Sequence, residues 1–538
     1  MEPATIAALL RELAVYYELD GDRHRAFAYD RAAKAVEAAN GLHRLLDEGR
    51  LEELPGVGPS IARVIAELAR RGTVAVIERL REQWPAVVIE LAQLPKVGVI
   101  KARKIYQALA PANLDAVAAL CHAGALRELP GFGKVSEQRI LQAIEERRLQ
   151  GARMLLLDAE NHAASLAHHL RGEAYAVASD HRDAVADRLA RFALVTSIDR
   201  GDAGAPIIGY LAGGLRAEVH VAPRNQLGWT QIVATGSTDH VAQLRDRGAA
   251  RGMNLAILQA GDERMIYRAL GMPWIPPELR DGSDEVAAAV AGDDFSDLIT
   301  ADDITTAFHC HTTYSDGKAT IGEMAHAAAE LGFDAITITD HSAAATYAGG
   351  LDLARLRAQL AEIDALVDPE VRILRGTEAD ILADGAIDVP RELIPELDVI
   401  IASIHQRFHL DRDAMTARLL TAMRQPYFKI WGHALGRMVL RRDPIEVRID
   451  DVLDAVAESP AAIEINGDPY RLDLDPVHAR QAARRGIKFV LSCDAHSTRA
   501  LDALRFAVAM ARRARIRKRD VLNALPPDEM MAVIRPVR

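Results

Sequence analysis

About the last 240 residues contain seven short apolar runs, and each run stops at a residue that can bind a metal ion. The runs cover residues 306–311, 335–341, 371–378, 399–405, 428–433, 462–466 and 489–496. Runs of this length and composition are typical of buried strands. Amphipathic helical stretches such as 321–331 and 353–366 lie between most of them. This alternation predicts a parallel sheet, and seven such units favour a closed or nearly closed β/α barrel.

The carboxyl ends of parallel barrel strands meet at one mouth, so the polar residues that end these runs are expected to converge. A single histidine at a strand end is more often a hydrogen-bonded core or surface residue than a metal ligand. Recurrence at strand after strand favours a metal centre instead. The predicted ligands are His309, His311, Asp316 in the first loop, His341, Glu378, His405, His433, Asp494 and His496.

The chemistry of these ligands narrows the ion and the reaction. Imidazole and carboxylate without cysteine suit Zn, Mn or Fe(II), and a histidine-rich set argues against Ca or Mg as dedicated occupants. Nine ligands are too many for one ion, so two or three divalent ions are expected, with Glu378 or Asp494 as a bridging candidate. Clustered ions acidify a bound water and clamp the oxygens of a phosphoester. The barrel is therefore predicted to be a metal-dependent phosphoesterase.

The strings HCHTTYSDG, TDHS, RGTEADILADG, ASIH, WGHALGR, EIN and SCDAHS follow one another over about residues 303–525. Their order and spacing resemble the motifs of the PHP (polymerase and histidinol phosphatase) domain. One departure is Ala307, where the family usually has an Asp that is not itself a ligand, so its loss bears on tuning of the ligands rather than on metal binding. The resemblance implies one ion held by His309, His311, Glu378 and Asp494, a second by Glu378, His405 and His433, and a third by Asp316, His341 and His496.

The N-terminal third carries three copies of a different pattern, at residues 54–62, 94–102 and 129–136. Each copy places a tight glycine turn before a helix, which leaves backbone N–H groups free to bind a phosphate. This is the helix-hairpin-helix pattern of proteins that hold the DNA backbone without reading sequence. A helical repeat that serves only packing is the alternative, but basic residues beside the copies favour DNA. The candidate DNA-binding residues are Gly56, Gly58, Gly98, Lys101, Gly131, Gly133 and Lys134.

The hairpins followed by a PHP domain resemble the bacterial family X DNA polymerases. Weaker likenesses continue through residues 214–237, similar to the later palm, and residues 266–280, similar to the thumb. However, residues 150–235 contain neither the Gly-Ser-x-Arg-Arg nor the Asp-x-Asp stretch that such a palm needs. Glu218 stands where the third carboxylate would be, and alone it cannot hold two magnesium ions. Ser60 and Val64 occupy the positions of the family's lyase lysine, so lyase activity is also expected to be absent.

Length and charge limit the remaining possibilities. We expect a multidomain chain with an α-helical helix-hairpin-helix N-terminal region, a small α/β degenerate palm and thumb, and a C-terminal distorted (β/α)7 PHP barrel. The net charge of −11 does not suit a general nucleic-acid binder, so DNA contacts should be local. Three unpaired cysteines, an acidic N-terminal helix and the lack of a long apolar run indicate a cytoplasmic protein without membrane contact. The expected domains are 1–80 (first hairpin), 81–150 (fingers-like, second and third hairpins), 151–235 (degenerate palm), 236–300 (thumb-like domain and linker) and 301–538 (PHP).

Together these features predict a DNA-binding, metal-dependent phosphoesterase. The family resemblance favours a 3′ to 5′ exonuclease, or a nuclease that processes abasic sites or blocked 3′ ends in DNA repair, with polymerase activity lost. Arg437, Arg442 and Arg471 follow strand ends and are candidate phosphate clamps, although surface arginines are common in this chain. An active DNA polymerase, a non-catalytic DNA scaffold and a small-molecule phosphatase remain as alternatives.

Overall fold

The computed structural model describes residues 1–39, 41–94, 97–150, 154–171, 181–211, 215–366 and 370–536. The chain divides into two compact units: Met1–Ala234 with Ala256–Glu263, and Thr235–Leu255 with Arg264–Arg538. The three cysteines are buried free thiols. Within the described ranges, none of the helices is both long and apolar enough to cross a membrane.

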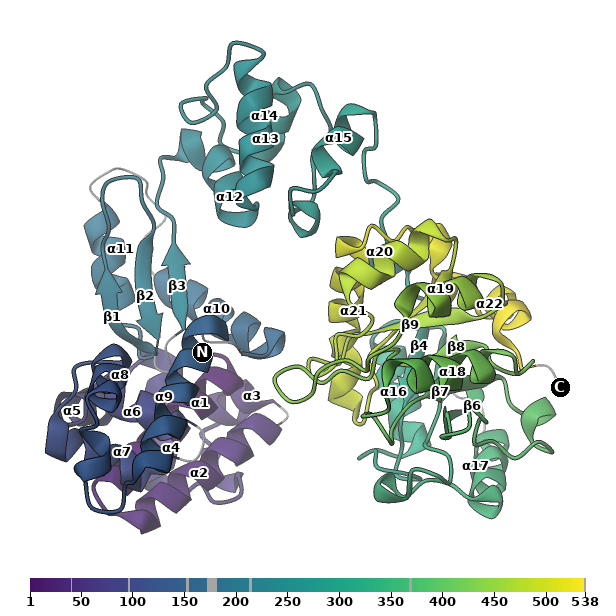
Figure 1. Cartoon of the computed structure of the whole chain (residues 1–538), viewed down its shortest axis with the longest axis horizontal. Coiled ribbons are helices and arrows are strands. Elements are labelled where there is room, and N and C mark those ends of the chain that lie inside the picture. Colours follow the sequence, from purple (N-terminus) through teal and green to yellow (C-terminus); the bar gives the residue numbers. More distant parts are fainter. Residues whose placement is uncertain are drawn as a thin grey trace. The chain divides into compact units, whose positions relative to one another are not determined.

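Helices dominate the first unit (Figure 1). The largest helix pair is α1 with α2, where the rings of Tyr17 and Tyr29 stack with centroids 5.2 Å apart. A continuous apolar core runs from these helices to the small sheet that follows. The helices are α1 (Pro3–Leu19), α2 (Arg23–Ala38), α3 (Leu42–Asp47), α4 (Pro59–Arg71), α5 (Ala75–Gln83), α6 (Ala86–Gln93), α7 (Gly98–Leu109), α8 (Leu114–His122), α9 (Lys134–Gln150), α10 (Leu156–Arg171) and α11 (His181–Ala190).

The three hairpin segments share one backbone hydrogen bond. In each, an apolar residue between the two turn positions donates its backbone N–H to a leucine carbonyl three residues earlier, at 3.0 Å for Val57, 3.1 Å for Val97 and 3.0 Å for Phe132. The side chains of these three residues are buried. The glycine that follows each of these buried residues, Gly58, Gly98 or Gly133, is exposed at the start of α4, α7 or α9.

A small antiparallel sheet follows α11. Its strands β1 (Val195–Asp199), β2 (Ile207–Leu211) and β3 (Arg216–Val219) pair in the order β1-β2-β3. Helix α11 packs on β1 and β2. Three further helices follow in the chain: α12 (Leu227–Thr235), α13 (Thr238–Ala249) and α14 (Glu263–Ala269).

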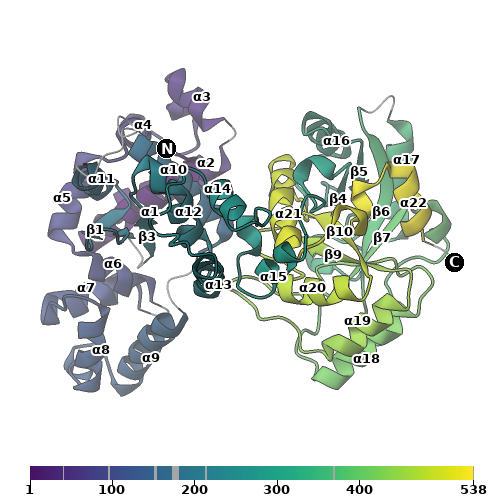
Figure 2. The ribbon, with the colours of Figure 1, turned by 90° about the horizontal axis from the view of Figure 1, so that it is seen from above.

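A seven-stranded parallel sheet forms the centre of the second unit, in the order β10-β9-β8-β7-β6-β5-β4. Its strands are β4 (Thr306–Cys310), β5 (Ala335–Ile338), β6 (Arg372–Asp380), β7 (Val399–Ser403), β8 (Ile430–Trp431), β9 (Ala462–Asn466) and β10 (Lys488–Ser492). Its helices are α15 (Glu285–Val290), α16 (Ile321–Glu330), α17 (Leu353–Ala365), α18 (Arg412–Met423), α19 (Ile449–Ala457), α20 (Pro476–Arg484), α21 (Leu504–Arg513) and α22 (Pro527–Ile534). Figure 2 shows helices α16 to α21 arranged around the strands.

The sheet curls into a nearly closed barrel, which confirms the predicted fold. Two backbone hydrogen bonds join its edges beyond the ends of β4 and β10: His311 N to the Ala495 carbonyl at 2.9 Å, and Ala495 N to the His309 carbonyl at 2.8 Å. At the opposite end, apolar side chains from the strands pack against Met530 and Ile534 of α22. Because α22 fills this end, access to the barrel interior is from the carboxyl ends of the strands.

Asn523 also joins the two edge strands of the barrel. Its side chain accepts a hydrogen bond from Leu491 N at 3.0 Å and donates to the carbonyl oxygens of Leu491 and Thr306 at 2.8 and 3.0 Å. The residue is fully buried. Buried backbone groups that lose their partners destabilise a fold by more than the net gain of the bond itself.

We therefore expect Asn523→Ala to destabilise the closure of the barrel by about 3 kcal/mol. Hydrogen exchange followed by mass spectrometry should show faster exchange in peptides that contain β4 and β10. Asn113→Ala, which removes a helix cap from α8 in the other unit, is the matched control and should leave barrel peptides unchanged. Equal protection of β4 and β10 in both variants would contradict this role for Asn523.

Candidate metal centre and nucleic-acid interface

The nine predicted ligands come together at the carboxyl ends of the strands. Several sit where the chain leaves its strand in a left-handed conformation, with φ of +63° at His309, +23° at His433 and +50° at Asp494. The pairing of β4 with β5 is also irregular between Ala307 and Cys310. Non-glycine residues rarely adopt such φ values, and they persist where the surrounding structure holds a functional geometry.

Glu378 on β6 occupies the middle of the cluster. Its Oε1 lies 2.8 Å from His433 Nε2, 3.2 Å from His405 Nε2 and 3.3 Å from His309 Nε2. Its Oε2 lies 2.9 Å from His341 Nδ1 and 3.7 Å from His311 Nε2. One buried carboxylate therefore faces five imidazoles, which is the arrangement expected of a group that bridges two ions.

Two further carboxylates border the cluster. Asp494 Oδ1 lies 3.2 Å from His311 Nε2 and 3.7 Å from His309 Nε2. Asp316 Oδ1 lies 3.3 Å from His496 Nε2 and 3.6 Å from His341 Nε2. The side chains of Asp316 and His496 are 36% and 33% exposed, so this border is the open side of the cluster.

The ligand atoms gather into four overlapping groups within which all atoms lie within 4.8 Å of one another. One group contains the predicted third set together with His311, and another contains three of the four residues of the predicted first set. Glu378 divides its neighbours differently from the expected second set, because it groups with His433 beside His309 and with His405 beside His341. The groups are His311, Asp316, His341 and His496; His309, Glu378 and His433; His309, His311 and Asp494; and His341, Glu378 and His405.

The donor set fits divalent metal ions. Within the described part of the chain, several buried ring nitrogens and carboxylate oxygens of the cluster have no hydrogen-bond partner of good geometry. Buried polar groups are normally satisfied, so a set of unsatisfied atoms that face one another needs an additional partner. The unsatisfied atoms are His309 Nε2, His311 Nδ1 and Nε2, His341 Nδ1, Glu378 Oε2, His405 Nε2, His433 Nδ1 and Asp494 Oδ1.

Electrostatics within the cluster keep its carboxylates charged. Burial alone would raise the pKa of Glu378, but His405, His309 and His341 hold it well below its usual range. Burial would likewise raise the pKa of Asp494, and His309 with Arg471 holds it well below its usual range. Both groups are thus anionic at neutral pH, which is the form that a cation requires.

The pKa values of the imidazoles are shifted in both directions. Burial, followed by the neighbouring His496 and His341, lowers the pKa of His311 to about 4. Burial also opposes protonation of His405, but Glu378 and Asp380 raise its pKa to about 9. Bound cations would compete with the proton on His405, so metal binding should release protons near neutral pH.

Two carboxylates behind the predicted ligands, Glu464 and Asp380, orient the histidine rings. Neither residue was among the predicted site residues. The fully buried Glu464 on β9 accepts from Ser492 Oγ at 2.6 Å, lies 2.6 Å from His309 Nδ1, and accepts the backbone N–H of His433. Asp380 bonds His405 Nδ1 in the same way. A charged residue between two isoleucines of a buried strand was the available signal for Glu464.

Asp340 anchors the loop that carries Asp316. Its carboxylate accepts the backbone N–H and hydroxyl of Thr312 at 2.8 and 2.6 Å, and the Gln359 amide at 2.5 Å. It also accepts the backbone N–H of Ser315 at 3.2 Å. The loop is therefore fixed by a buried acceptor, which explains how an exposed Asp316 keeps its place beside His341 and His496.

The three arginines predicted to clamp phosphate make contacts within the protein. Arg471 Nε donates to Asp494 Oδ2 at 2.6 Å. Arg437 Nε donates to the Arg471 carbonyl at 2.8 Å, and Arg442 donates to the Gly436 carbonyl at 2.7 Å while its guanidinium lies 3.5 Å from the centre of the Phe408 ring. Arg471 thus fixes a predicted ligand, and the clamping role of all three remains a prediction.

The hairpin glycines adopt the conformation that the sequence pattern requires. Gly56, Gly98 and Gly131 have φ of +82°, +65° and +89°, a region that favours glycine. Gly98 begins α7, while Gly58 and Gly133 immediately precede α4 and α9. Lys104 Nζ would lie 3.7 Å from a Cβ at Gly131, so the second and third hairpins bring basic side chains near one turn. Lys101 is half-buried on α7 and Lys134 is exposed at the start of α9, whereas Pro95 and Lys96 lie outside the described residues.

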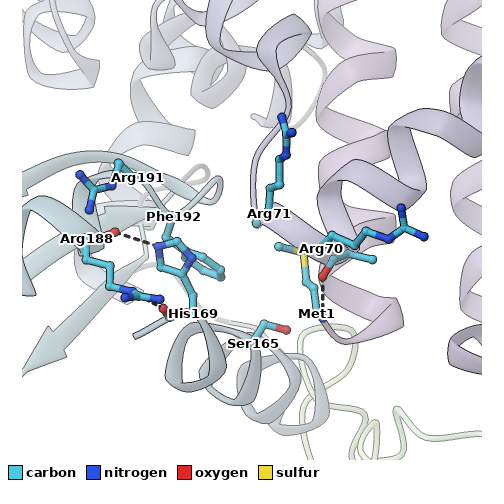
Figure 3. A pocket seen from close by; sticks show the side chains of 10 residues that line it. Met1, Arg70, Arg71, Ser165, His169, Arg188, Arg191 and Phe192 are labelled. Atoms are coloured by element: carbon cyan, nitrogen blue, oxygen red, sulfur yellow. Dashed lines mark hydrogen bonds between the residues drawn. The ribbon is translucent and has the colours of Figure 1, made fainter. Parts of the chain in front are cut away.

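A basic pocket of about 600 Å³ lies at the far end of α4. Arg70 and Arg71 border one side, and His169, Arg188 and Phe192 border the other (Figure 3). The backbone N–H of Ala193 donates to the Gly72 carbonyl at 3.0 Å and holds the two sides together. No carboxylate lines the pocket among the described residues. A pocket of this charge suits phosphate groups in a chain that is acidic overall.

The described part of the region predicted to be a degenerate palm shows no pair of acids on one strand. Asp183 and Asp187 lie on α11 and form ion pairs with Arg200, and Asp180 lies outside the described residues. Glu218 is on β3 and pairs with Arg216. Asp199 on β1 is separated from Glu218 by β2.

Comparison with known proteins agrees with this architecture. The PHP domain model matches residues 307–468, a helix-hairpin-helix domain model matches residues 1–74, a SAM-like helix-hairpin-helix tandem model matches residues 88–146, and a DNA polymerase beta thumb model matches residues 230–281. The barrel is thus that of a PHP domain, and the chain also carries helix-hairpin-helix and thumb regions.

Whole-chain similarity identifies the family. The DNA polymerase/3′-5′ exonuclease PolX of Bacillus subtilis is 31% identical in an alignment that covers 99% of this chain and 100% of that protein. The chain therefore belongs to the family X DNA polymerases that carry a PHP domain. A probable phosphatase of Caldanaerobacter subterraneus is 33% identical over 35% of this chain and 74% of its own length. A histidinol phosphate phosphatase of Lactococcus lactis, solved with zinc, L-histidinol and phosphate, is 18% identical over 38% of this chain and 93% of its own, with a TM-score of 0.28.

The position of Glu464 behind His309 leads to a prediction about metal binding. Glu464→Gln keeps the size of the side chain but replaces one carboxylate oxygen with a donor, so His309 loses its fixed orientation. We expect metal affinity to fall by about 10- to 100-fold, measured by calorimetric titration of the metal-free protein. Glu330→Gln on the exposed face of α16 is the control and should bind metal as the wild type does. Unchanged affinity in the Glu464 variant would show that this carboxylate does not orient the ligands.

Proposed function

We propose that this protein is a DNA-binding, metal-dependent phosphoesterase that acts in the cytoplasm. Its reaction is hydrolysis of DNA at a 3′ end, as a 3′ to 5′ exonuclease or a nuclease that processes abasic sites or blocked ends in DNA repair. Two or three ions of Mn, Zn or Fe are the proposed cofactors. The observation that carries the proposal is the cluster of nine metal-competent residues around Glu378, with buried atoms that no protein group satisfies.

The arrangement of the residues suggests how the reaction proceeds. Bound divalent ions would supply an acidified water and neutralise charge on the phosphate oxygens. Glu378 and the histidines around it would hold the ions, while Glu464 and Asp380 keep the His309 and His405 rings oriented. The phosphate would enter beside Asp316 and His496, because this is the exposed border of the cluster.

We further propose that DNA is held by the hairpins and the basic pocket, and that the palm does not polymerise. The glycine turns expose backbone N–H groups at the start of helices, and Arg70, Arg71 and Arg188 add positive charge at the far end of α4. Against polymerisation, Asp183 and Asp187 lie on helix α11 and form ion pairs with Arg200. The name of the Bacillus subtilis relative includes both a DNA polymerase and a 3′-5′ exonuclease activity. In this chain the missing pair of acids favours the exonuclease activity alone.

The metal centre predicts which substitutions abolish hydrolysis. His405→Ala removes a contact of Glu378, so we expect a loss of at least about 100-fold in hydrolysis of a 3′-labelled oligonucleotide, with DNA affinity unchanged. His326→Ala, an exposed histidine on α16, is the control and should retain full activity. A His405 variant with full metal content and wild-type activity would overturn the catalytic assignment. Chelation that leaves wild-type hydrolysis intact would overturn the metal requirement.

The palm predicts that purified protein does not extend a primer. Without two carboxylates on one strand, the site cannot hold the pair of magnesium ions that nucleotidyl transfer needs. Primer extension with dNTPs in magnesium or manganese should therefore give no product, beside an active DNA polymerase as a positive control. Incorporation that disappears with Glu218→Ala would show an altered but active palm. Incorporation that survives this substitution would place polymerisation elsewhere in the chain.

The hairpins predict a selective effect on long substrates. Gly131→Val with Gly133→Val should block the third turn, because valine disfavours positive φ and hinders the approach of a phosphate. We expect the double variant to lose hydrolysis of long DNA but to keep hydrolysis of bis(p-nitrophenyl) phosphate. We also expect the affinity of the wild type for DNA to fall steeply as the salt concentration rises. Gly21→Val, at a positive φ outside the hairpins, controls for general strain. Equal loss on both substrates in a folded double variant would assign the hairpins a purely structural role.

A further inference from the structure

The mouth of the barrel displays an aromatic side chain that neither the motifs nor the proposed ligands include. Tyr347 follows His341 on the loop after β5, and its side chain makes the residue 65% exposed. Its ring centroid lies 6.1 Å from that of His341 and 6.3 Å from that of His405. Both imidazoles contact Glu378. The Tyr347 ring therefore lies beside two predicted ligands of the metal cluster, and most of the residue is exposed to solvent.

The segment that carries Tyr347 is firmly attached to the barrel. The flanking residues Ala345 and Ala348 are buried. The backbone N–H of Ala344 donates to Asp388 Oδ2 at 2.6 Å, and its carbonyl accepts from the Gln406 amide at 2.8 Å. A side chain displayed by an anchored segment is already oriented for a ligand, so little ordering entropy opposes binding.

We propose that Tyr347 is a stacking platform for a nucleobase next to the phosphodiester that enters the cluster. The proposal rests on the proposed phosphoesterase function and adds a contact between the protein and a base of the substrate. Aromatic rings stack on any base, because every base has a π-face, and this contact does not select sequence. A single exposed tyrosine is common on protein surfaces. The ring centroid of this one, however, lies 6.1 and 6.3 Å from those of two predicted ligands.

The short distance between Tyr347 and the cluster decides which substrates benefit. A phosphate held near Glu378 places its own nucleotide, rather than one several residues away, within reach of the ring. A phosphomonoester without a base would gain nothing from Tyr347. The residue is thus expected to act on substrate affinity and to leave the chemical step unchanged, because Tyr347 is itself neither a predicted metal ligand nor one of the carboxylates that orient the ligands.

Dithymidine monophosphate tests the proposal, since this dinucleotide is too short to depend on the hairpins. Two analogues each replace one thymine with a base-free tetrahydrofuran residue. Binding to manganese-loaded protein is measured by calorimetry, and KM and kcat for hydrolysis are measured separately. We expect the wild type to bind at least one analogue about 10-fold more weakly than dithymidine monophosphate. Tyr347→Ala should bind all three equally weakly and show a raised KM with kcat unchanged.

Two further variants make the result specific to stacking. Tyr347→Phe keeps the ring and should match the wild type, while Tyr210→Ala on β2 is a matched loss of a partly exposed tyrosine and should also match it. A Phe variant as weak as the Ala variant would overturn stacking in favour of a hydroxyl contact. Equal affinity of the wild type for all three dinucleotides would overturn the platform altogether.

The same measurements separate this inference from the proposed function. Binding that depends on the base and on Tyr347, without hydrolysis by the wild type, would support the platform and refute the phosphoesterase assignment. Hydrolysis that is indifferent to the base and to Tyr347→Ala would support the phosphoesterase assignment and refute the platform.

Discussion

The buried carboxylate of Glu378 is the interaction around which the barrel mouth is organised. Five imidazoles lie within 3.7 Å of its two oxygens. A buried anion without compensating charge is strongly unfavourable, and buried histidines that are not satisfied are unfavourable as well. Each group therefore depends on the others, and the unsatisfied atoms of the cluster fit the bound cations that we propose. This agrees with the positive φ values that three of the predicted ligands, His309, His433 and Asp494, keep near the ends of their strands.

A second set of contacts transmits this arrangement into the body of the barrel. Glu464 connects His309 to Ser492 and to the backbone of His433, so three strand ends share one acceptor. Asp340 accepts hydrogen bonds from the loop that carries Asp316. Arg471 donates a hydrogen bond to Asp494. The loss of the family's Asp at Ala307 is therefore accompanied by intact carboxylates behind the other ligands. Rigid support of this kind is what keeps metal ligands oriented.

The hairpins and the barrel, at the two ends of the chain, differ from the small sheet between them in the functional residues that they carry. The hairpins have glycine turns and the barrel mouth gathers all nine predicted ligands, whereas the described strands of the small sheet between them carry separated acids, Asp199 and Glu218. A centre that needs two adjacent carboxylates is lost when one is removed, and no single remaining acid can replace the pair. This pattern is the reason that we propose a DNA-binding nuclease rather than a polymerase.

The order of the apolar runs and the residues that end them were sufficient to predict the barrel and to collect His309, Glu378 and Asp494 at one mouth, because strand polarity alone sends those positions to the same edge. The glycine turns were predictable for a similar local reason, since φ at Gly56 and Gly131 depends on residue type. The grouping of ligands around Glu378 was not predictable, because it depends on which strands become neighbours and on how β4 bends at His309. The roles of Glu464, Asn523 and Tyr347 likewise appear only in the folded molecule, where residues distant in sequence become partners through burial and distance rather than through any motif.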